Sequence, residues 1–181
     1  MSVLYEFTRK LVDERRFSFA QFVGHGCGAL RRKCRSWADD LLRRGCSQLV
    51  VLHDEDGKGE AEIRKVLACY IESQRFQNKI ILIPVEEIEA WLLCDSAALK
   101  TVFNMRVEPA LPRWPEAISG PKEFLGEIVS KCSNTRYVNT VHNRRIAEAV
   151  AISTMSRCPS FASYPSFVRS SFQNRSTRRI S

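Results

Sequence analysis

The chain has 181 residues, enough for one domain with a small appendage, and 44% of them are hydrophobic, an ordinary fraction for a globular core. No apolar run approaches the roughly 18 residues of a membrane span, and the N-terminus lacks the features of a signal peptide. The seven cysteines form no CxxC pair, which disfavours a disulfide scaffold or a structural zinc site. We therefore expect a soluble, cytoplasmic protein.

The net charge of +8 is unevenly distributed along the chain. It is +5 over residues 1–49, −5 over 50–95, +1 over 96–132 and +7 over 133–181. An acidic middle between basic segments suits a metal-binding centre with a polyanion running past it. The alternative is that the basic residues are ordinary solvent-exposed residues on helix faces and in a tail, which would give the same charge distribution. The candidate nucleic-acid contacts are Arg31, Arg32, Lys33, Arg144 and Arg145.

Apolar runs and helical periodicity alternate over the first hundred residues. The expected strands are residues 2–5, 17–23, 48–52 and 79–85. The expected helices are residues 7–16, 29–44, 59–74 and 86–93. This order of elements predicts an α/β fold in which helices cover a parallel sheet.

After residue 100 the pattern changes to proline-punctuated loops and helices. Helices are expected at residues 122–131, 144–154 and 164–172. We expect three regions: an α/β core over residues 1–100, a helical extension packed on it over 101–172, and a disordered basic tail over 173–181.

The strand expected at residues 48–52 is followed by a run of carboxylates, Asp54-Glu55-Asp56. Side chains two apart share one side of an extended chain, so Asp54 and Asp56 can converge. Ligands of open α/β sheets bind outside the carboxyl ends of the strands, and Mg²⁺ takes only one or two protein carboxylates. We expect Asp54 and Asp56 to bind Mg²⁺ or Mn²⁺. A solvated acidic loop, or a helix cap at Asp56, would fit the same residues.

The strand expected at residues 79–85 also ends in carboxylates. Two successive strands that end in acids are more specific than one, so we expect Glu87 and Glu89 to contribute to the same centre. Trp91, in the same run, is expected to pack in the hydrophobic core.

Glu6 and Lys122 are the candidate catalytic residues. Glu6 directly follows the first expected strand and could lie at the same sheet edge as Asp54; a first-turn glutamate favoured by the helix dipole is the alternative. Lys122 is a candidate phosphate contact, or simply the start of a helix. The glycine-rich residues 24–28 match neither the dinucleotide fingerprint nor the P-loop spacing and fit a plain turn.

These motifs resemble a known family. Glu6 after a first strand and Asp54-x-Asp56 after a later one resemble the Toprim domain of topoisomerases, primases and nucleases of the overcoming-lysogenization-defect type. A small branch of stand-alone bacterial Toprim-like proteins, often encoded beside an ATPase in defence or mobile-element contexts, shows a further similarity. The residues that carry it are Glu87-Ile88-Glu89-Ala90-Trp91-Leu92-x-x-Asp95, Pro121-Lys122-Glu123 and Ser160-Phe161.

The resemblance covers roughly residues 2–170 and implies a four-stranded parallel core with helices on both faces. It implies Mg²⁺ or Mn²⁺ at the Asp-x-Asp pair, a general acid or base at Glu6, and a second metal at Glu87 and Glu89. Phe7 stands where the family usually has glycine. Two metals would stabilise the attacking and leaving oxygens of a phosphodiester cleavage.

We therefore predict a metal-dependent nuclease, or nuclease-like effector, that cleaves DNA or RNA, with an ATPase as a candidate partner in bacterial defence. The alternative is a non-catalytic module that binds nucleic acid or an ATPase through its basic flanks. A third interpretation is a small phosphoryl-transfer enzyme with a nucleotide substrate.

Overall fold

The computed structural model describes residues 2–24, 27–55, 57 and 59–173. Its centre is a two-stranded parallel sheet of β1 (Gln48–Leu52) and β2 (Asn78–Leu82). Both strands are short apolar runs, as expected for parallel strands covered on both faces. Beyond the strands the pairing continues, since His53 N–H donates to the Leu82 carbonyl at 3.1 Å.

The α/β expectation holds, but the four-stranded parallel sheet is wrong: in the described part of the chain only two of the four expected strands form. Residues 2–5 fall at the start of helix α1 (Val3–Leu11), because the Ser2 hydroxyl caps that helix by accepting the N–H of Tyr5. Residues 17–23 form no helix or strand, and no ladder pairs them with β1. An apolar run becomes a strand only where its backbone finds a partner.

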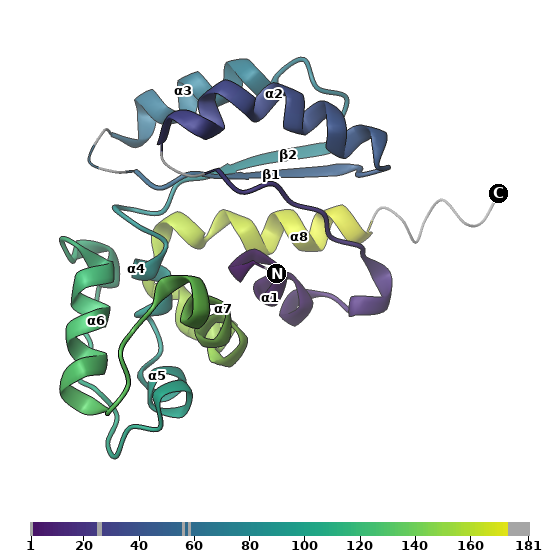
Figure 1. The fold of residues 1–181 in the computed structure, drawn as a ribbon. Coiled ribbons are helices and arrows are strands. Elements are labelled where there is room, and N and C mark those ends of the chain that lie inside the picture. Colours follow the sequence, from purple (N-terminus) through teal and green to yellow (C-terminus); the bar gives the residue numbers. More distant parts are fainter. Residues whose placement is uncertain (1, 25–26, 56, 58, 174–181) are drawn as a thin grey trace.

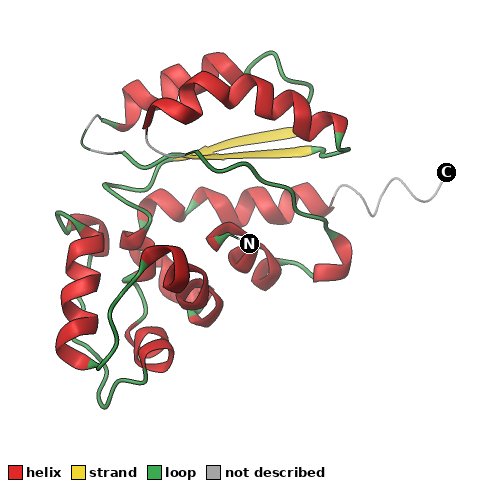
Figure 2. Ribbon diagram, in the orientation of Figure 1, coloured by secondary structure: helices red, strands yellow, loops and turns green. Residues whose placement is uncertain are grey.

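Helices cover both faces of the sheet (Figure 1, Figure 2). On one face lie α2 (Cys27–Arg43) and α3 (Glu60–Ile71), and on the other α1 and α8 (Ser163–Gln173). Successive side chains of a strand point to opposite faces of the sheet, so each strand contributes side chains to both helical layers. Leu49 and Val51 pack in one core cluster with residues of α2 and α3, whereas Leu82 belongs to the second cluster, with residues of α1 and α8.

The remaining helices form the part of the molecule away from α2 and α3 (Figure 1). They are α4 (Glu89–Leu92), α5 (Ser96–Phe103), α6 (Pro121–Cys132) and α7 (Asn139–Ala149). Short 3₁₀ helices lie at Glu14–Arg16, Pro115–Ala117, Ile152–Arg157 and Pro159–Phe161. The helix α5, which the sequence pattern did not predict, begins where the Asp95 carboxylate accepts the N–H of Ala98 at 3.0 Å.

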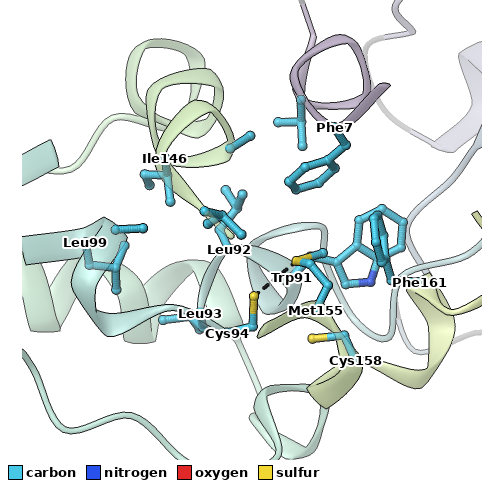
Figure 3. Packing of buried hydrophobic residues seen from close by; sticks show 14 of the residues in the cluster. Phe7, Trp91, Leu92, Leu93, Cys94, Leu99, Ile146, Met155, Cys158 and Phe161 are labelled. Atoms are coloured by element: carbon cyan, nitrogen blue, oxygen red, sulfur yellow. Dashed lines mark hydrogen bonds between the residues drawn. The ribbon is translucent and has the colours of Figure 1, made fainter. Parts of the chain in front are cut away.

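The larger core cluster joins the two ends of the chain to the middle (Figure 3). The Phe161 ring meets the rings of Phe7 and Trp91 edge-on, with centroids 5.2 and 5.1 Å apart. Trp91 is fully buried, and its indole Nε1–H donates to the Ser160 hydroxyl at 2.8 Å. Among the residues that the structure describes, no helix has the length and apolarity needed to cross a membrane.

Candidate functional site at the carboxyl edge of the sheet

The structure brings the acidic end of β1 next to the acidic segment that follows β2. The Asp54 Oδ1 atom accepts the backbone N–H of Ile88 at 3.1 Å. Ile88 lies between Glu87 and Glu89, so this bond joins the two strand ends at one edge of the sheet. A second link is the N–H of Glu55, which donates to the Pro84 carbonyl at 3.2 Å.

A tight turn at Glu86 directs the chain out of β2. The N–H of Glu87 donates to the Val85 carbonyl at 2.7 Å, which closes a three-residue turn around Glu86. Glu86 has φ of 58°, in the left-handed region that residues other than glycine seldom occupy. Such strained residues persist where the surrounding contacts hold them and are concentrated at functional sites.

Glu87 lies against the N-terminus of α6. Its Oε2 atom accepts the backbone N–H of Lys122 at 3.0 Å. Burial raises the pKa of the Glu87 carboxyl above its usual value, and the charges of Glu89 and Glu123 add to that effect, while the bond from Lys122 opposes it. Lys122 therefore reaches the predicted edge through its backbone amide, and its side chain is half-buried.

Glu89 is almost completely buried and held by two side chains. Its Oε1 atom accepts the Tyr137 hydroxyl at 3.0 Å and the Asn143 side-chain amide at 2.9 Å. Burial and the neighbouring Glu89 charge raise the pKa of Tyr137 far above its usual value, so this hydroxyl keeps its proton, for which Glu89 Oε1 and Asn143 Oδ1, the latter at 2.5 Å, are the two acceptors. Spacing in the sequence gave no sign of these partners, which lie 48 and 54 residues away.

Glu6 lies in α1 and not at the end of a strand, so the sheet-edge placement expected for it is wrong. Its side chain is fully buried. The Oε1 atom accepts Arg144 Nε at 2.7 Å, and Oε2 accepts Arg9 Nη1 at 3.0 Å. Arg144, an expected nucleic-acid contact, thus neutralises Glu6. The alternative considered for Glu6, a first-turn helix residue, matches its position.

The other basic candidates lie on two helices. Arg145 is exposed on α7. Arg32 and Lys33 are exposed on α2, and the Lys33 ammonium lies 5.9 Å from the centre of the Trp37 ring. Arg31 belongs to α2, but its side chain is outside the described part of the structure.

Residues 9–168 match the family DUF4276, described as a domain of unknown function. The chain belongs to the DUF4276 family. No curated protein and no solved structure matches it. The resemblance of this DUF4276 chain to Toprim-like proteins stays a prediction.

Few of the described carboxylates are candidates to bind a divalent metal ion at this edge. Asp56 lies outside the described residues. Within the described ranges, no three or more His, Cys, Asp or Glu side chains are grouped so that they could hold a metal ion. Mg²⁺ commonly takes only one or two protein carboxylates, so Asp54 and Glu87, which the bond to the Ile88 amide brings to the same sheet edge, are the candidate ligands. Glu89 accepts both of its bonds at Oε1 and is almost completely buried, which favours a positioning role for it.

Proposed function

We propose that this DUF4276 protein is a Mg²⁺- or Mn²⁺-dependent nuclease with its centre at the carboxyl edge of β1 and β2. The observation that carries the proposal is the bond from the Ile88 amide to Asp54, which joins the acidic ends of both strands. This edge is where parallel α/β sheets bind their ligands.

Each residue of this edge has a role in the proposal. Asp54 and Glu87, with Asp56, would hold the cation. A divalent cation there would supply stabilisation of negative charge on the oxygens of a phosphodiester. Glu89 keeps the segment after β2 in place through Tyr137 and Asn143. Lys122, in the first turn of α6, adds positive potential for a phosphate group.

Glu6 does not fit the role of general acid or base, because it is fully buried between two arginines. Glu87 acts as a ligand in this proposal. A cation beside it would lower the pKa of its carboxyl, which burial and two neighbouring carboxylates otherwise raise.

The test is cleavage of plasmid, single-stranded DNA and RNA with Mg²⁺ or Mn²⁺. The informative variants are Asp54→Asn and Glu87→Gln, because each retains a carbonyl oxygen for the same backbone N–H and loses only the charge. We expect each to lower the rate by about 100-fold or more. The control is Glu127→Gln on the exposed face of α6, where the carboxylate pairs with Lys131 at 3.0 Å. It should leave the rate unchanged.

Two results would contradict the proposal. One is the absence of cleavage of all three substrates with either metal, and the other is cleavage that Asp54→Asn and Glu87→Gln leave intact. Salt-sensitive nucleic-acid binding without cleavage, unchanged in Asp54→Asn, would instead identify a non-catalytic binding module.

A further inference from the structure

A cavity of about 650 Å³ lies along the outer edge of β1. Residues 47–54 line it, whereas no residue of β2 does, so the cavity is on the side of β1 that faces away from its partner strand. Side chains of α2 and of α8 form opposite walls, and residues 17–24 form a third. Its volume is typical of small-molecule sites. It reaches Asp54 and Ile88 and is therefore continuous with the candidate nuclease centre.

The β1 backbone offers hydrogen-bonding groups to this cavity. His53 and Glu55 donate their N–H groups toward β2, and backbone groups alternate in direction along a strand. The N–H and C=O groups of Val50 and Leu52 therefore point away from β2. The described residues provide no hydrogen-bond partner for these outward groups. An unpaired strand edge presents alternating donors and acceptors to whatever lies beside it.

Two buried polar side chains on the cavity wall also have unused capacity. His53 is 7% exposed, and its Nδ1 lies 2.5 Å from the carbonyl oxygen of Asp54. A carbonyl oxygen can only accept, so Nδ1–H donates to it, and in a neutral imidazole Nε2 is then an acceptor. Neither His53 Nε2 nor the Oγ of Ser171, a residue that is 3% exposed, has a hydrogen-bond partner among the described residues. Buried polar atoms normally have one.

The wall is aromatic near β1. Phe22 and Trp37 stack with centroids 5.4 Å apart and planes 6° from parallel, and both line the cavity. A flat aromatic ligand gains by packing against such rings. The cavity thus combines flat apolar surface, a strand edge with donors and acceptors, and a histidine acceptor.

We propose that this cavity binds an unpaired nucleobase. A base is flat and carries N–H donors beside ring-nitrogen and carbonyl acceptors, which match the outward groups of Val50 and Leu52. An exocyclic amine or ring N–H matches His53 Nε2. With a base in the cavity, its attached phosphate reaches the edge at Asp54. This last step rests on the proposed nuclease function and gives it a substrate class, single-stranded nucleic acid or nucleotides; base binding itself does not depend on cleavage.

The first test measures binding without metal. Nucleoside 5′-monophosphates are titrated into the protein in EDTA by calorimetry, with ribose 5-phosphate as the ligand that lacks a base. We expect the nucleotides to bind at least about tenfold more tightly than ribose 5-phosphate, because stacking supplies most of the gain. Equal affinity for AMP and ribose 5-phosphate would overturn the proposal.

Matched variants locate the binding in the cavity. Leu30→Phe adds bulk from the α2 wall, whereas Leu42→Phe makes the same change on the same helix outside the cavity lining. We expect Leu30→Phe to weaken nucleotide binding by about tenfold and Leu42→Phe to leave it unchanged. If Leu30→Phe does not fold, Ser171→Ala removes only the unpartnered hydroxyl and should still weaken binding. Folded Leu30→Phe and Ser171→Ala proteins that bind as tightly as the wild type would refute the site.

The two proposals fail separately. Base-dependent binding in EDTA without any cleavage in Mg²⁺ or Mn²⁺ refutes the nuclease function alone. Cleavage that depends on Asp54, without base-dependent binding, refutes the base pocket alone. If both hold, Leu30→Phe should raise KM and leave kcat unchanged, because the variant alters binding at a distance from the reacting phosphate.

Discussion

The substitution Glu6→Gln separates a structural role of this glutamate from a catalytic one. The carboxylate is fully buried and accepts two charge-assisted hydrogen bonds, from Arg144 at 2.7 Å and from Arg9 at 3.0 Å. Glutamine keeps one acceptor oxygen but turns an NH₂ group toward a guanidinium, so one bond is lost and two donors face each other. The structure therefore predicts a loss of stability.

The size of the loss follows from the bonds and their exposure. A hydrogen bond to a charged group contributes about 1.5–3 kcal/mol net. The two arginine side chains are 36% and 45% exposed, so water screens them and the lower part of that range applies. We expect Glu6→Gln to lower the free energy of unfolding by about 2 kcal/mol. For a domain of this size, Tm then falls by about 4–8 °C.

Thermal unfolding followed by circular dichroism measures this shift. The control is Glu14→Gln, which removes a 2.6 Å pair with Arg9 whose carboxylate is half-exposed, and Tm should stay within about 2 °C of wild type. An unchanged Tm for Glu6→Gln would refute the structural role. If cleavage were also lost in that variant, Glu6 would have the catalytic role that the sequence pattern predicted.

Three further predictions concern stability. Phe161→Ala, at a ring in contact with Phe7 and Trp91, should cost about 3–5 kcal/mol in urea unfolding; a loss below about 1 kcal/mol would contradict the packing. Burial raises the pKa of Tyr164 to about 12, above the roughly 10 of an exposed tyrosine. The contribution of Tyr164 to the free energy of unfolding is therefore complete below pH 10 and is lost as the pH rises toward 12. Tm should thus fall less between pH 9 and pH 11 in Tyr164→Phe than in wild type; equal falls would argue against this cause. Glu86→Gly should raise the free energy of unfolding by about 0.5–1 kcal/mol, because glycine adopts φ of 58° without strain, and a lower Tm would contradict it.

The sequence by itself determined the elements whose signal is local. The strand predicted at residues 48–52 is confirmed at both ends as β1. A strand of a parallel sheet is covered on both faces, so its sequence is a short continuous apolar run, and that pattern is visible locally. Helical periodicity likewise predicted α2, α3 and α6 to within a few residues. The carboxylates after both strands were visible in the same way, as an abrupt change from apolar to acidic residues.

Tertiary structure decided what these local signals could not. Residues 2–5 and 17–23 are as apolar as true strands, but a strand requires a neighbouring backbone, and no local pattern shows whether one is there. Glu6 looked like a sheet-edge carboxylate until its contact with Arg144, 138 residues away, placed it in a buried ion pair. Glu89 was recognised as acidic but not as buried, since Tyr137 and Asn143 reach it from a distant part of the chain. Residue type fixes which chemistry a side chain can perform, and packing between distant segments decides whether that side chain is left available to perform it.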